Sequence, residues 1–247
     1  MGVGRAQVVA ALSAVYDPEL DEPITTLGFV DSLSVSGRGD VDVHLRLPTP
    51  QCAPNFAFLM VSDARAAVGA LPGVGEVSVV LGDHYTGPEI NAAVGDGGDF
   101  AAAFPGETVG DLDALRALFQ RKALLARQGR VCAALLEGGA APDGGLSAEA
   151  VVALRVVDLD GLGLPADIAR EAARCLVLRR ALGLPVAADA PALIAGGGSA
   201  LDAADLPLWL RRARLVSLSL ESNGGICRSL LRVRHGVPDP TQETALA

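Results

Sequence analysis

Residues 45–52, with the sequence LRLPTPQC, decide how the first part of this chain folds. They end a stretch, residues 41–47, in which apolar and polar side chains alternate strictly, and this period of two is typical of a strand buried on one face. Pro48 and Pro50 then remove two backbone donors and stiffen the chain where it leaves the sheet. The position of Cys52 is therefore predicted to be fixed by the backbone.

A helix is predicted directly after Cys52. Pro54 suits a first helical turn, and apolar residues recur at helical spacing through residues 54–71. Cys52 would thus lie just ahead of a helix N-terminus, where unpaired N–H groups and the positive end of the helix dipole favour a thiolate. A thiolate is the form that binds iron or attacks an electrophile. The alternative is that Cys52 is a small buried hydrophobe, as unpaired cysteines usually are.

The elements around this stretch predict a small α+β domain. A helix at residues 5–16, an Asp-Pro-Glu turn at residues 17–19 and a strand at residues 29–35 precede it, and a strand at residues 77–81 follows the second helix. Pro18 ends the first helix because it disfavours the α conformation in the residue before it. The order helix, strand, strand, helix, strand describes an αββαβ sandwich with one sheet face covered.

This order of elements resembles the PaaD/SufT-like family of metal–sulfur cluster biosynthesis proteins. The resemblance covers the first third of the chain and is carried by three short segments, VYDPEL at 15–20, LGFV at 27–30 and PTPQC at 48–52. It implies that Cys52 binds a metal or cluster. It also implies that Asp17 and Glu19 lie beside Cys52, where they would orient the thiol or contact the bound metal. The cargo implied is iron or an iron–sulfur cluster, bound transiently.

The polar loop at residues 82–91 supplies further candidates. Thr86 and Glu89 have the spacing of a capping box for a short helix. His84 would reach the end of the sheet that carries Cys52, so it is a candidate metal ligand. It is also the candidate base if Cys52 were the nucleophile of an enzyme. The plainer interpretation is a polar loop that follows a strand and has no such role.

The second half of the chain is predicted to be mostly helical. Glycine-rich residues 95–110 form the expected linker between a first domain, residues 1–94, and an accessory domain, residues 111–247, that would dock on a partner. Helical periodicity covers four ranges, 111–137, 147–157, 165–182 and a broken helix pair at 200–214 around Pro207. Cys132 and Cys175 fall on apolar faces and are predicted core residues. No strand-to-helix Gly-x-x-x-x-Gly-Lys sequence is present, which argues against an ATPase module.

The segment near the end of the chain contains the second cysteine of interest. Residues 216–220 alternate apolar side chains with serine and predict a strand, and the sequence SNGG at 222–225 predicts a turn. Residues 226–235 fit either a return strand or a helix, and the helix is favoured because basic residues precede a glycine at its end. Cys227 would lie near the N-terminus of that helix and is the second candidate metal ligand. A structural thiol is the alternative.

Composition excludes several classes of function. The 247 residues carry a formal net charge of -9, which leaves no basic surface for nucleic acid or anionic lipid. No apolar run approaches the roughly 20 residues that a membrane span requires. The N-terminus has no targeting pattern, and the four cysteines form no Cys-x-x-Cys pair. The sequence thus predicts a soluble, cytoplasmic protein whose partners are proteins or metal ions.

These observations predict a non-catalytic maturation factor that carries iron or an iron–sulfur cluster to a recipient metalloenzyme or to other assembly proteins. Because a cluster normally takes about four protein ligands, Cys52 would need Cys227, a homodimer or a partner's ligands to hold one. The first alternative is an adaptor or chaperone that binds no metal and assists assembly of a diiron monooxygenase-type complex. The second is a cysteine enzyme, which is less favoured because the chain has only three histidines.

Overall fold

The computed structural model of the chain describes residues 2–106, 112–138 and 144–236. The chain divides into two compact units, one made of Met1–Leu115 together with Glu221–Ala247 and the other of Arg116–Leu220. Each unit has its own hydrophobic core. The domain limits 1–94, 95–110 and 111–247 stay a prediction, since compactness alone does not define what folds independently.

A three-stranded sheet forms the centre of the first unit. Its strands, β1 (Val30–Val35), β2 (Val41–Leu45) and β3 (Val77–Leu81), lie in the order β1-β2-β3. The first pair is antiparallel and the second is parallel, with Val41 beside Val77. The strict alternation predicted for β2 is confirmed, because its apolar side chains are buried while Asp42 and the neighbouring histidine are exposed.

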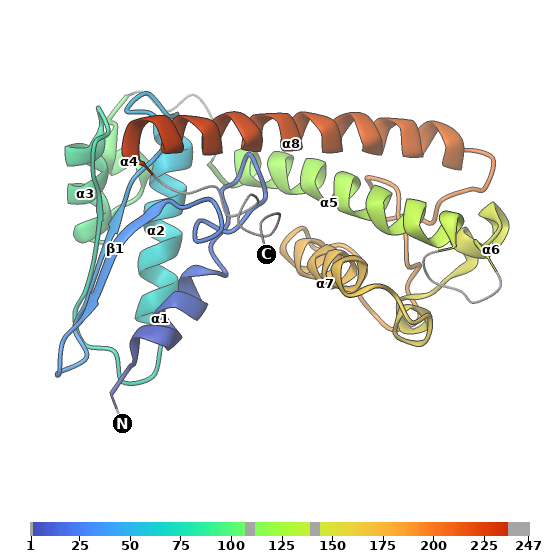
Figure 1. Cartoon of the computed structure of the whole chain (residues 1–247), viewed down its shortest axis with the longest axis horizontal. Coiled ribbons are helices and arrows are strands. Elements are labelled where there is room, and N and C mark those ends of the chain that lie inside the picture. Colours follow the sequence, from blue (N-terminus) through green and yellow to red (C-terminus); the bar gives the residue numbers. More distant parts are fainter. Residues whose placement is uncertain (1, 107–111, 139–143, 237–247) are drawn as a thin grey trace. The chain divides into compact units, whose positions relative to one another are not determined.

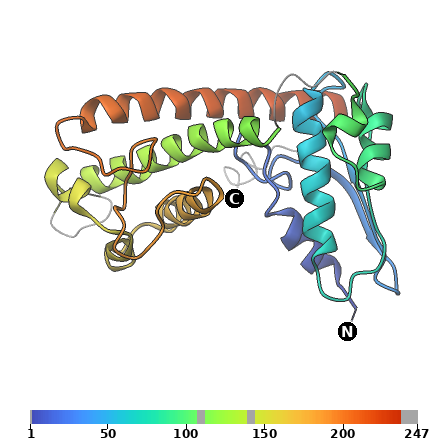
Figure 2. The same cartoon turned by 180° about the vertical axis from the view of Figure 1, so that it is seen from behind.

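Helices α1 (Arg5–Leu12) and α2 (Pro54–Gly69) bury their apolar side chains in the same core as the sheet, and Figures 1 and 2 show both helices alongside the strands. The chain continues from β3 into α3 (Gly87–Gly95) and the short α4 (Phe100–Ala103). The α+β fold class, a small helix-and-sheet domain followed by a mostly helical part, is confirmed. The first helix is shorter than predicted, because the chain already turns after Leu12.

Part of the expected linker packs on the first unit. The ring of Phe100 meets that of Phe58 edge to face, with the centroids 5.5 Å apart, and Phe104 is buried in the same core. Part of the segment predicted to be an irregular linker is therefore held in place by its buried aromatic side chains.

The second unit is helical. It contains most of α5 (Leu112–Glu137), then α6 (Ala148–Ala153), the 3-10 helix η1 (Val156–Gly161), α7 (Ala166–Ala181) and the first half of α8 (Leu206–His235). Within this unit α5 and α8 run side by side in both views (Figures 1 and 2) and approach closely where Gly129 faces Ala213. Cys132 and Cys175 are buried, as predicted.

The predictions for residues 200–225 are wrong. The structure has one continuous helix, α8, instead of a broken helix pair, a strand and a turn. Pro207 lies in its first turn, where a missing N–H costs nothing. Ser217 is buried and accepts a hydrogen bond from Arg130, so this serine marks a polar helix contact instead of a strand face. Gly224 gives room for Glu22, whose Oε1 would lie 3.0 Å from a Cβ at that position.

Over the described residues, no helix combines the length and apolarity that crossing a membrane demands.

Candidate functional site

Cys52 lies in a tight turn immediately before α2. Its N–H donates to the Thr49 carbonyl oxygen at 3.3 Å, and its Sγ lies 3.6 Å from Thr49 Oγ1. The residue after it, Ala53, is the N-cap of α2, and Pro54 begins the helix. The side chain is half-buried and packs against the core of the first unit. The predicted location ahead of a helix N-terminus is confirmed.

Donors from outside the cysteine loop hold its backbone carbonyls. His84 Nε2 donates to the Cys52 carbonyl oxygen at 2.8 Å, and the Tyr85 N–H donates to the Pro50 carbonyl oxygen at 3.2 Å. Arg234 Nη1, from the last turn of α8, donates to the Pro48 carbonyl oxygen at 3.0 Å. The loop is thus fixed by more than its prolines.

His84 is engaged through both ring nitrogens. Its Nδ1 lies 3.1 Å from Thr86 Oγ1 and 3.3 Å from the Thr86 N–H, while Nε2 is bonded to the cysteine loop. Thr86 therefore does not cap α3 with its hydroxyl, and Glu89 is exposed, so the predicted capping box is wrong. In this arrangement both ring nitrogens of His84 are hydrogen-bonded, and Nε2 holds the backbone of the cysteine loop.

The Asp-Pro-Glu turn is organised by its own aspartate. Asp17 Oδ1 accepts the N–H groups of Glu19 and Leu20, each at 2.8 Å. Burial raises the pKa of the Asp17 carboxyl to about 6, and these two hydrogen bonds oppose the rise only in part. The carboxylate therefore serves the turn itself.

The last part of α8 covers this turn within the first unit. Asn223 Nδ2 donates to Glu19 Oε1 at 3.3 Å, and Arg228 forms an ion pair with Glu22 at 2.9 Å. Leu231 is buried in the core of the first unit. Sequence reasoning missed Arg228 and Glu22, because residues 206 positions apart share no local pattern.

Cys227 lies on the same stretch of α8, between Asn223 and Arg228. It is half-buried and packs on the core that Cys52 also contacts. Burial first, and then the charges of Asp17, Cys52 and Glu19, raise the pKa of the Cys227 thiol to about 12. The expectation of a helix N-terminus at Cys227 is wrong, because α8 begins much earlier, at Leu206.

Four predicted site residues therefore gather in the first unit: Asp17, Glu19, Cys52 and Cys227. Their elements are the Asp-Pro-Glu turn, the cysteine loop and α8. In the part of the chain that the structure describes, no three or more His, Cys, Asp or Glu side chains are grouped to hold a metal ion. The Cys227 thiol lies within electrostatic range of Asp17, Glu19 and the Cys52 thiol, and these four residues do not form a complete coordination site.

Known proteins resemble this part of the chain. The sequence profile of a family described as iron-sulfur cluster assembly protein matches residues 5–79. The chain is 36% identical over 75 residues to the chloroplastic Fe-S cluster assembly factor HCF101 of Arabidopsis thaliana, a match that covers 30% of this chain and 14% of that protein.

Two shorter relatives are covered more completely. The uncharacterized protein MJ1129 of Methanocaldococcus jannaschii is 32% identical over 89 residues, 36% of this chain and 92% of the relative. An Fe-S protein maturation auxiliary factor of Porphyromonas gingivalis is 32% identical over 74 residues, 30% of this chain and 69% of the relative.

The fold and the matched segment define the class of protein: a small α+β assembly domain with a cysteine loop. The chain belongs to the iron–sulfur cluster assembly protein family, as its resemblance to metal–sulfur cluster biosynthesis proteins predicted. The matched profile residues, 5–79, contain Asp17, Glu19 and Cys52 but not Cys227 or the rest of α8.

Proposed function

We propose that this protein is a non-catalytic assembly factor that holds iron or an iron–sulfur cluster transiently on Cys52 and passes it to a recipient metalloenzyme or to another assembly protein. Family membership supports a role in iron–sulfur cluster assembly. The observation that carries the finer proposal is the gathering of a second thiol, Cys227, and two acids near a loop whose backbone is held from outside.

The two thiols suit a cargo that must leave again. Iron in clusters is normally held by about four protein thiolates. Cys52 and Cys227 supply two, so the remaining ligands would come from a second copy of the chain or from the recipient. A cargo with exchangeable ligands can move by stepwise replacement of one thiolate by another.

The charges around Cys227 favour a cation. Burial first, and then Asp17 and Glu19, disfavour a free thiolate at Cys227, and the two acids would attract a metal ion. A metal that binds a thiol displaces its proton, so binding couples to proton release. The site would therefore disfavour a thiolate without a metal ion and favour a metal-bound thiolate.

The contacts of His84 support a carrier more than a cysteine enzyme. A nucleophilic cysteine needs a base within hydrogen-bond reach of its sulfur. His84 instead donates to the Cys52 carbonyl oxygen and meets Thr86 with its other nitrogen. We therefore assign His84 a positioning role.

Anaerobic reconstitution with ferrous iron and sulfide tests the proposal. Iron content, sulfide content and charge-transfer absorption are measured on the wild type, Cys52→Ser and Cys227→Ser, with Cys175→Ala as the matched cysteine control from the second unit. We expect Cys52→Ser to remove bound iron, Cys227→Ser to reduce it and the control to keep it.

The other outcomes separate the alternatives. No metal on any variant would contradict a carrier and favour the adaptor for a diiron monooxygenase-type complex. Iron that depends on Cys52 but not on Cys227 would make Cys227 structural and assign the missing ligands to a second copy or a partner.

A further inference from the structure

The outer edge of β3 carries unpaired peptide groups. The Val41 N–H donates to the Glu76 carbonyl oxygen, and the Gly82 N–H donates to the Leu45 carbonyl oxygen, so the even-numbered residues of this strand face β2. The peptide groups of Val77 and Val79 therefore point away from β2. Over the described residues, no strand pairs with that edge.

At one position on the same edge, a side chain provides the hydrogen bonds that a neighbouring strand would make. The Leu81 N–H donates to Asn91 Oδ1 at 2.8 Å, and Asn91 Nδ2 donates to the Leu81 carbonyl oxygen at 3.1 Å. A side-chain amide has one donor side and one acceptor side, as a peptide group has. Asn91 thus occupies the place of a neighbouring strand at Leu81, while the next two outward positions, Val79 and Val77, are left open.

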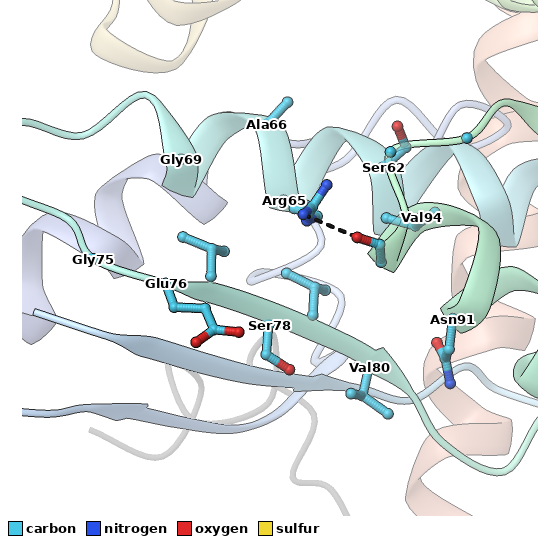
Figure 3. A pocket seen from close by; sticks show the side chains of 15 residues that line it. Ser62, Arg65, Ala66, Gly69, Gly75, Glu76, Ser78, Val80, Asn91 and Val94 are labelled. Carbon is cyan, nitrogen blue, oxygen red and sulfur yellow. Dashed lines mark hydrogen bonds between the residues drawn. The ribbon is translucent and has the colours of Figure 1, made fainter.

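A groove runs along these open positions. It has a volume of about 770 Å³ and is lined by α2, the outer edge of β3 and the end of α3, all in the first unit (Figure 3). Arg65 closes one side by donating to the Gly95 carbonyl oxygen at 3.2 Å. Glycines 69, 75, 95, 97 and 98 contribute much of the wall, so little side-chain bulk obstructs it.

We propose that this groove receives an extended polypeptide segment of a partner protein, which adds to the sheet as a fourth strand beside β3. Its peptide groups would bond to those of Val77 and Val79, where the Asn91 amide ends the series. The surface is distinct from the cysteine loop, so the proposal does not depend on metal carriage.

The chain offers variants that block the edge, one at an open position and one at Val77, which packs against the core of the first unit. A Cβ at Gly69 would meet nothing within 4 Å, so Gly69→Trp fills the groove and Gly69→Ala leaves it open. Val77 begins β3 and its N–H points outward, so Val77→Pro removes an edge donor without removing a bond to β2. Val77→Thr is the matched control that keeps the donor.

The test uses a library of random nine-residue peptides displayed on phage and selected on the full-length protein. The best peptide is then titrated into the isotope-labelled protein and followed by amide resonances. We expect the Val77 and Val79 amides to shift and to gain protection from hydrogen exchange. Affinity should fall at least about tenfold for Gly69→Trp and for Val77→Pro, and hold for both controls.

Two results would overturn the proposal. One is a selection that yields no peptide, or only peptides whose binding is unchanged by Gly69→Trp and Val77→Pro. The other is a wild-type dimer that Gly69→Trp converts to a monomer, with no peptide bound, which would assign the edge to a second copy. Iron reconstitution of Gly69→Trp, expected to match the wild type, keeps this test separate from that of the carrier.

Discussion

The four cysteines divide into two pairs, and the pairs differ in their surroundings. Cys132 and Cys175 are buried in the second unit, where burial is the main reason that each thiol has a pKa raised to about 12. Cys227 has the same raised pKa, but acids and the Cys52 thiol contribute to it. The comparison shows that an equal pKa can have different causes: several arginines oppose the rise at Cys175, whereas two acids and a second thiol add to it at Cys227.

The largest effect is expected from Cys52→Ser. It should lower the bound iron of the reconstituted protein by at least about tenfold, because the serine oxygen is a poor iron ligand. Cys132→Ala should leave the iron unchanged, and metal analysis of both variants checks this. If both variants lost the same amount of iron, the two pairs of cysteines would not differ in metal binding.

Arg179→Met should destabilise the second unit without affecting metal binding. The side chain is fully buried and donates to Gln128 at 2.9 Å and to the Pro191 carbonyl oxygen at 2.9 Å. Its loss removes these buried hydrogen bonds, which costs about 3 kcal/mol of unfolding free energy. Urea unfolding measures the cost, and iron reconstitution of the folded variant should match the wild type.

Asp17→Asn should stabilise the first unit at neutral pH. The folded-state pKa of Asp17 is raised from 3.8 to about 6, so its contribution is fully present below pH 3.8 and is lost as the pH rises through about 6. The asparagine keeps an oxygen for the Glu19 and Leu20 N–H groups but carries no charge. The gain at pH 7 should be about 3 kcal/mol at most.

Urea unfolding between pH 4 and pH 7 provides the measurement. The wild type should lose stability over this range relative to Asp17→Asn. If the unfolding free energies of the two proteins change with pH in the same way, ionisation of the buried Asp17 carboxyl does not destabilise the first unit.

His84→Phe should cost about 1 to 2 kcal/mol of unfolding free energy, because the partly buried Cys52 carbonyl oxygen loses its 2.8 Å partner. If His84 only positions the loop, the iron-to-protein ratio at saturation should stay the same. A lower iron-to-protein ratio in a stably folded variant would instead indicate that His84 is a metal ligand together with Cys52 and Cys227.

Arg228→Gln should have the smallest effect, about 0.5 to 1 kcal/mol. The ion pair with Glu22 is partly exposed, with side-chain accessibilities of 19% and 29%. The variant loosens α8 beside Cys227 and leaves Cys132 and Cys175 untouched. Mass spectrometry should show faster alkylation of Cys227 and unchanged alkylation of Cys132 and Cys175, which would separate the two pairs by their accessibility.

The sequence predicted the first unit well because its signals are local. The alternation in β2 and the two prolines before Cys52 act over a few residues, and the structure confirms both the strand and the cysteine's place before α2. The site was predicted less completely. The association of Asp17 and Glu19 with Cys52 came from the family resemblance, not from spacing.

The error at α8 has a physical reason. Alternating leucine and serine at 216–220 satisfies a strand pattern, but the decisive contacts are long-range: Ser217 with Arg130 in the second unit, and Arg228 with Glu22 in the first. Tertiary contacts of this kind override local propensity, and a single sequence does not display them.

The return of α8 to the first unit has a consequence for biosynthesis. A ribosome makes the whole second unit, Arg116–Leu220, before it makes Leu231, which the first core buries. The nascent cysteine loop and Asp-Pro-Glu turn therefore emerge long before the segment that covers them. Completion of the candidate site is delayed until the second unit has been translated, so nascent chains would expose Cys52 without its companion thiol.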